Sequence, residues 1–137
     1  MGGKVAQPIA GRNLVKGLRG MVLIAPAPPT PLVLPGEMRE QQLAAYSSSQ
    51  SAQFVVRNVL SGSLLSSETI QELVEDMMRG NEFAKAAWPA YVMGEDIVNE
   101  TRKIDVPVLV VVGEKDRVET VERVTSSWQF EGGDGGA

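Results

Sequence analysis

Apolar residues form two short continuous runs, at Met21–Ala25 and at Val108–Val112. Each run is bounded by glycine and proline and is too short for a stable helix, a pattern typical of strands that are buried on both faces. Such strands belong to parallel sheets, in which neighbouring strands are joined by a long connection. The sequence therefore predicts an α/β fold with two neighbouring parallel strands.

Elsewhere the apolar residues recur at helical spacing. The clearest case is Ser67–Gly80, where Ser67 is the expected N-terminal cap and Gly80 the expected terminator. Prolines make up half of Pro26–Pro35 and predict an irregular connection there. The same spacing predicts further helices over residues 2–13 (short or kinked at Pro8), 38–46, 52–60, 82–93 (bent or broken at Pro89) and 120–124.

These patterns divide the chain into four segments. Residues 1–35 contain a helix and the first strand, and residues 36–103 form an all-helical insert. Residues 104–128 contain the second strand and a following helix. Residues 129–137, rich in glycine, have little to bury, and we expect them to be disordered.

Composition and charge narrow the range of possible functions. Thirteen Lys and Arg against seventeen Asp and Glu give a net charge of −4, so no basic surface is expected for nucleic acid. No apolar run is long enough to cross a membrane, and the first residues lack a signal-peptide layout, so we expect a cytoplasmic protein. The absence of Cys and His removes the commonest metal ligands and general bases, and we expect no cofactor.

Three segments carry a resemblance to a known family. Met1–Gln7 resembles the stretch just after the nucleophilic serine of α/β-hydrolases, whose elbow commonly reads G-x-S-M-G-G. Arg19–Pro26 is similar to the strand that follows the nucleophile helix, and Ile104–Asp116 is similar to the strand and turn that carry the acid. The segments occur in the family's order, with a helical lid between them, so the resemblance implies a partial α/β-hydrolase fold.

The resemblance also implies a site. Asp116 matches the triad acid, which orients a histidine in this family, and Met1 matches the position whose backbone N–H contributes to the oxyanion hole. Asp105 precedes its strand and is expected to be structural. The implied substrate is a small ester, amide, thioester or diketone. Because the serine would stand directly before Met1, we expect a fragment that is itself catalytically incompetent.

The helical insert leaves two interpretations open. Its aromatic residues and methionines either form its own core or line a substrate pocket under the lid, and Trp88 and Tyr91 are the strongest pocket candidates. An alternative function is a non-catalytic module in which the insert binds an apolar molecule or a protein. In either case, unpaired edges of the short strands predict self-association.

Overall fold

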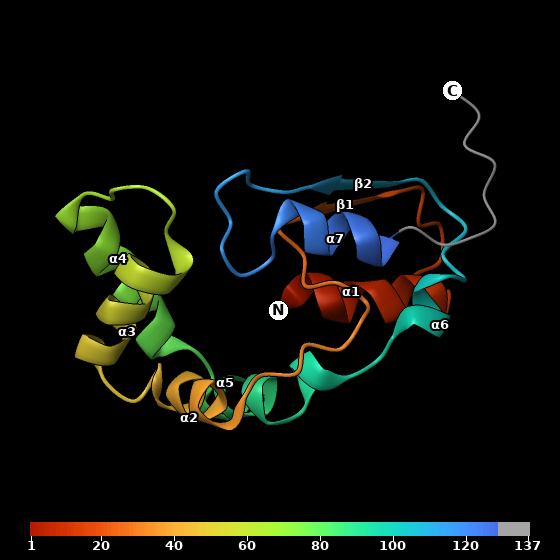
Figure 1. The fold of residues 1–137 in the computed structure, drawn as a ribbon. Helices are drawn as coiled ribbons and strands as arrows, with labels where there is room; N and C mark the ends of the chain where they lie inside the picture. Colours follow the sequence, from red (N-terminus) through yellow and green to blue (C-terminus); the bar gives the residue numbers. More distant parts are fainter. Residues whose placement is uncertain (129–137) are drawn as a thin grey trace. The chain divides into compact units, whose positions relative to one another are not determined.

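The computed structural model describes residues 1–128 as a mixed α/β fold, drawn in Figure 1. Its elements are α1 (Gly2–Gly11), β1 (Met21–Ile24), α2 (Gly36–Ala44), α3 (Ser49–Val55), the π-helix η1 (Val56–Leu60), α4 (Ser67–Arg79), α5 (Glu82–Ala90), the 3₁₀-helix η2 (Val92–Gly94), α6 (Val98–Thr101), β2 (Val108–Val111) and α7 (Val121–Trp128). The expectation for residues 129–137 lies outside the described residues.

The chain divides into two compact units, which are described separately. Unit 1 comprises residues 1–31, 96–114 and 119 onward, and it contains the sheet with α1, α6 and α7. Unit 2 comprises residues 32–95 and 115–118, and it contains α2 to α5. The short helix α6 therefore belongs with α1 rather than with the other helices of the insert.

In unit 1, β1 and β2 pair in parallel, with Met21 opposite Val108 and Ile24 opposite Val111. The Ala25 N–H extends the ladder by donating to the carbonyl of Val111 at 2.7 Å. This pairing confirms the prediction of two neighbouring parallel strands joined by a long connection. Residues 25–35 between β1 and α2 form no regular element, as their prolines predict.

The prediction that both strands are buried on both faces is wrong. Leu23 is only 4% exposed, whereas Val22 and Ile24 on the other face of β1 are 63% and 76% exposed. A Cβ atom on Gly3 of α1 would lie 3.9 Å from Leu23, so α1 packs on the Leu23 face. Figure 1 shows α7 on the same side of the sheet as α1. With both helices on one side, the other face of each strand stays open.

A buried glutamine connects α1 to the rest of unit 1. Gln7 is fully buried, and its side-chain amide donates to the carbonyl of Ala27 at 3.0 Å and to that of Gly3 at 3.1 Å. Its amide oxygen lies 3.3 Å from the hydroxyl of Thr101, in α6. One side chain thus joins α1, the segment after β1 and α6. Buried polar groups are tolerated when they are hydrogen-bonded in this way.

The contact between α1 and α6 is close. A Cβ atom on Gly11 would clash with the backbone carbonyl of Glu100, so a larger residue does not fit at this position. Next to it, the Arg12 guanidinium donates to the Glu100 carboxylate at 2.9 Å. This hydrogen bond lowers the pKa of Glu100 below its usual value of 4.5. Glycine at position 11 therefore permits the close approach of α1 to α6, and the ion pair lies beside this contact.

Unit 2 has its own hydrophobic core between α3, η1 and α4. Its buried members are Ala52, Val56, Ile70 and Val74, against which Leu65, Met77 and Met78 pack. Met77 and Met78 therefore belong to the core of the insert, one of the two interpretations considered above. Phe54 does not belong to this core, because it is 63% exposed.

Several helix boundaries in unit 2 differ from the sequence prediction. The cap of α4 is Ser66 rather than Ser67, because the Ser66 hydroxyl oxygen accepts the Thr69 N–H at 3.1 Å. The helix α5 continues through Pro89 and ends one residue later. The predicted helix over residues 52–60 begins earlier, at Ser49, and finishes as a π-helix. The predicted helix over residues 67–80 is otherwise confirmed.

We expect Gln7→Met to destabilise unit 1 by about 2 kcal/mol, because methionine fills a similar volume but leaves the Ala27 carbonyl buried without its donor. Urea unfolding followed by the fluorescence of Trp128, in a Trp88→Phe background, measures unit 1. Val5→Met is the control, since Val5 is exposed on the same helix. Equal stability of the two variants would show that the Gln7 hydrogen bonds do not hold unit 1 together.

Candidate functional site

The predicted acid, Asp116, lies in the turn that follows β2 and belongs to unit 2. Its side chain is half-buried, and one carboxylate oxygen accepts the backbone N–H of Val118 at 2.9 Å. The neighbouring Lys115 packs closely on Gly62, where an added Cβ atom would lie 2.6 Å from the Lys115 carbonyl oxygen. The turn is therefore fixed both by the aspartate itself and by contact with the loop before α4.

Met1, the predicted oxyanion-hole position, belongs to unit 1 and directly precedes α1. Its carbonyl accepts the Lys4 N–H at 3.0 Å. Burial lowers the pKa of the Met1 amine, and the nearby Glu119 carboxylate opposes that shift. Glu119 is itself buried and ion-paired with Arg123 at 2.9 Å. Met1 and Asp116 belong to different units, and their joint role in catalysis stays a prediction.

The two aromatic candidates of the insert differ in position. Tyr91 is 51% exposed and lines a depression of about 240 Å³ in unit 2. Trp88 is half-buried and is not part of that lining. The depression is formed by the segments 32–34 and 89–95 together with Arg39, which donates to the Ala90 carbonyl at 2.8 Å. A role for Trp88 and Tyr91 in substrate binding stays a prediction.

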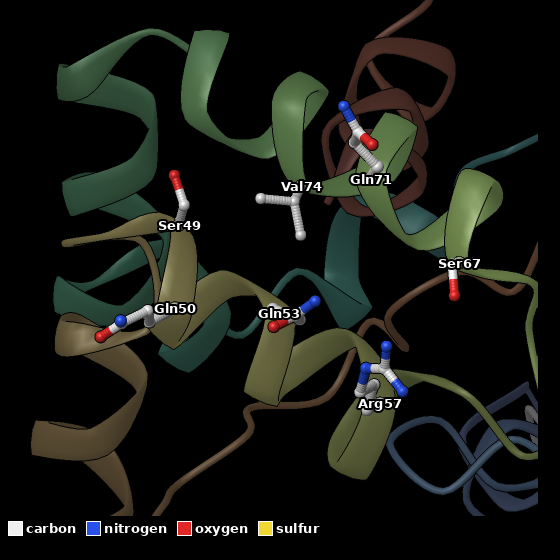
Figure 2. Close-up of a pocket in the computed structure, with 7 residues that line it drawn as sticks. All are labelled: Ser49, Gln50, Gln53, Arg57, Ser67, Gln71 and Val74. Carbon is white, nitrogen blue, oxygen red and sulfur yellow. The ribbon is translucent and has the colours of Figure 1, made fainter.

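A larger groove, of about 350 Å³, lies between the α3–η1 segment and α4 (Figure 2). Six of its seven lining side chains are polar, and only Val74 is apolar. The lining residues are Ser49, Gln50, Gln53, Arg57, Ser67, Gln71 and Val74. Ser49, Gln50 and Gln53 belong to α3 and Arg57 to η1, whereas Ser67, Gln71 and Val74 belong to α4.

Arg57 is the only positively charged side chain that lines this groove. It belongs to the π-helix η1, a type of helix that often occurs at functional sites. Within the described residues its guanidinium has neither an ion pair nor a hydrogen bond, whereas Gln71 donates to Glu75 at 3.1 Å. The groove can therefore offer a guanidinium, amides and hydroxyls to a polar or anionic group.

The sequence interpretation missed this groove, although a signal was present. Gln53 and Arg57 are four residues apart, as are Ser67 and Gln71, so each pair lies on one face of its helix. The buried polar residues of unit 1 were missed as well; they are Lys4, Gln7, Thr101 and Glu119. No pattern indicates them, because a buried polar residue and an exposed one look alike in a sequence.

Residues 1–128 contain neither a cluster of metal ligands nor a membrane-spanning helix. Over residues 1–128, three or more His, Cys, Asp or Glu side chains nowhere gather in a way that could hold a metal ion. Nor does this part of the chain contain a helix with the length and apolar character needed to span a bilayer.

Comparison with known proteins adds no identification. No family model matches the chain, and no curated protein matches it. The resemblance to α/β-hydrolases therefore depends on the residues and their order alone.

We expect Asp116→Ala to loosen the turn after β2, because alanine provides no acceptor for the Val118 N–H. A decrease of about 1 kcal/mol in the free energy of local opening would raise the hydrogen-exchange rate of the Val118 amide roughly fivefold. Asp116→Asn keeps an oxygen acceptor and should leave that rate nearly unchanged. If both variants exchange at the wild-type rate, this hydrogen bond does not hold the turn.

Proposed function

We propose that this chain is part of an α/β-hydrolase that acts on a small carbonyl substrate. The observation that supports the proposal best is the parallel, in-register pairing of β1 and β2 across a helical connection. The helix α1 directly precedes the first strand, and the turn with Asp116 directly follows the second. This is the order of nucleophile helix, strand, lid, strand and acid that the resemblance implies.

The chemistry of parallel sheets supports the role of Asp116. Ligands of open α/β sheets bind outside the carboxyl ends of the strands, and Asp116 follows the carboxyl end of β2 by a short turn. At the carboxyl end of β1, Ala25 has a φ of 43°, a left-handed conformation that is uncommon for a residue with a Cβ atom. Such backbone strain clusters at functional sites.

In the proposed reaction, a serine hydroxyl attacks the substrate carbonyl and a histidine removes its proton. Asp116 orients the histidine and stabilises its charged form, and backbone N–H groups bind the oxyanion. The 137 residues contain no histidine, and their serines cap helices or lie in loops or within helices. The proposed catalysis therefore needs a serine and a histidine beyond these residues, and the substrate class stays an ester, amide, thioester or diketone.

The second candidate function, a binding module built on the helical insert, is favoured by the groove between α3–η1 and α4. Its polar lining and Arg57, which has no ion pair within residues 1–128, suit a small carboxylate better than the apolar molecule considered from the sequence. Saturable shifts of the Gln53 and Gln71 side-chain amide resonances on titration with acetate, lost in Arg57→Gln, would favour this candidate over the hydrolase.

The hydrolase proposal predicts that the 137-residue chain turns over p-nitrophenyl esters only at the rate of the buffer. A lone carboxylate without nucleophile, imidazole and oxyanion hole lowers the barrier to acyl transfer very little. Saturable turnover that disappears in Asp116→Asn would contradict this account of the isolated chain.

The family assignment is tested by a longer chain. If the adjoining in-frame codons encode a G-x-S elbow and a histidine segment, the extended protein should hydrolyse the ester, and Asp116→Asn should reduce kcat by roughly 10⁴-fold. Asp105→Asn is the matched control, because Asp105 is exposed and precedes β2. Equal activity of the two variants, or adjoining codons without a serine elbow, would overturn the assignment.

A further inference from the structure

Most polar side chains of the groove between α3–η1 and α4 have no partner within residues 1–128. Those that make neither a hydrogen bond nor an ion pair there are Ser49, Gln50, Gln53, Arg57 and Ser67. The neighbouring Ser48 and Ser66, in contrast, use their hydroxyls to cap α3 and α4. The groove thus gathers donors and acceptors that the fold itself does not use.

The chemistry of the groove changes along its length. The α3–η1 segment and α4 are joined by the short loop 61–66, so they run antiparallel. Arg57 and Ser67 therefore share the end near the loop, and Figure 2 shows them on the same side of Gln53. Val74 lies about 10 Å from Ser67 along the axis of α4. The groove therefore offers a guanidinium at one end and an apolar contact about 10 Å away.

Two glutamines occupy the middle of the groove. The Gln71 amide group donates to the Glu75 carboxylate at 3.1 Å, so the amide oxygen of Gln71 remains as an acceptor. Gln53 has no such bond, and its amide is able to donate or to accept. Together the two side chains have the groups needed to pair with both the N–H and the C=O of an amide in a ligand.

The charges around the groove favour an anionic group at the Arg57 end. A guanidinium binds a carboxylate through two parallel hydrogen bonds, which makes the pair strong and specific. Glu75 would repel an anion, but it follows Gln71 in α4 and so lies farther along the helix from that end. Its carboxylate is also 3.8 Å from the Arg79 guanidinium, which offsets its charge.

We propose that the groove binds a carboxylate that one carbon atom separates from an amide, as in an N-acyl amino acid or at the C-terminus of a polypeptide. The carboxylate binds the Arg57 guanidinium and the Ser67 hydroxyl. The amide pairs with Gln53 and Gln71, and the acyl group contacts Val74. The groove volume of about 350 Å³ suits a ligand of this size. The proposal rests on the second candidate function and not on the hydrolase assignment.

Titration of the 137-residue chain with acetate and with N-acetylalanine, at constant ionic strength, tests the proposal. The Gln71 side-chain amide resonances report binding. N-Acetylalanine should bind about tenfold more tightly than acetate, because its amide adds two hydrogen bonds. N-Acetylalanine amide, which has no carboxylate, should bind at least tenfold more weakly than N-acetylalanine.

Variants separate the two ends of the ligand. Gln53→Met should weaken the binding of N-acetylalanine about fivefold and leave that of acetate unchanged, because methionine keeps the side-chain length and lacks the amide. Arg57→Gln should weaken the binding of both ligands tenfold or more. Gln41→Met is the matched control, since Gln41 is an exposed glutamine of α2 in the same unit and does not line the groove.

A peptide distinguishes the two sources of this chemistry. Acetyl-tetraalanine with a free carboxylate should bind more tightly than N-acetylalanine if the natural ligand is a polypeptide C-terminus, and more weakly if it is a free N-acyl amino acid. The C-terminally amidated peptide should not bind in either case. Equal binding of the amidated and the free peptide would overturn the proposal.

Two further outcomes would overturn it. Equal affinities for acetate and N-acetylalanine, or a Gln53→Met effect no larger than that of Gln41→Met, would contradict the role of the glutamines and leave the second candidate function in place. If neither acetate nor N-acetylalanine shifts the resonances, the groove is not a carboxylate site, and the proposal and the second candidate function fail together.

Discussion

Two parallel strands cannot be joined by a tight turn, and this constraint organises the chain. The end of β1 and the start of β2 lie at opposite ends of the sheet, so the connection has to return along its whole length. Here the connection contains α2 to α6, including all the helices of unit 2. The sheet thus determines where a helical insert with its own core is placed in the sequence.

The helix α1 is held to the segment after β1 by polar contacts. Lys4 and Gln7 are both buried on it, and both donate to carbonyls in residues 27–30, directly after β1. Those residues are rich in proline, which has no backbone N–H group. The segment therefore contains few backbone donors that could pair with its carbonyls. The side chains of α1 supply the missing donors, which explains how a segment without regular structure is buried.

The sequence predicted the features that depend on local pattern. It did not predict those that depend on contacts between distant parts of the chain. The apolar runs at Met21–Ala25 and Val108–Val112 indicated strands and their parallel pairing, because no other structure suits such short runs. Their indication of burial on both faces was wrong, since a valine in a strand is buried only if a helix covers it. Ser66 and Ser67 are equally good caps by residue type, and only the backbone geometry favours Ser66.

The candidate site could be predicted from the sequence to a smaller extent. The position of Asp116 after β2 follows from the strand, but its hydrogen bond to Val118 and the contact of the neighbouring Lys115 with Gly62 depend on the fold of the loop. The groove beside Arg57 depends on the packing of two helices that are joined by a loop. Residue spacing indicates which face each side chain occupies, and only packing brings the two faces together.

Hydrogen exchange of the 137-residue chain at low micromolar concentration tests the central structural claim most directly. The claim is that the sheet of unit 1, which is covered on one face only, is less stable than unit 2, which has a core of its own. The slowest amides should therefore lie in α3, η1 and α4, at Ala52, Val56, Ile70 and Val74, and the strand amides should exchange faster. If Leu23 and Val110 instead exchange most slowly, the sheet is stable with one face open, and the account is contradicted.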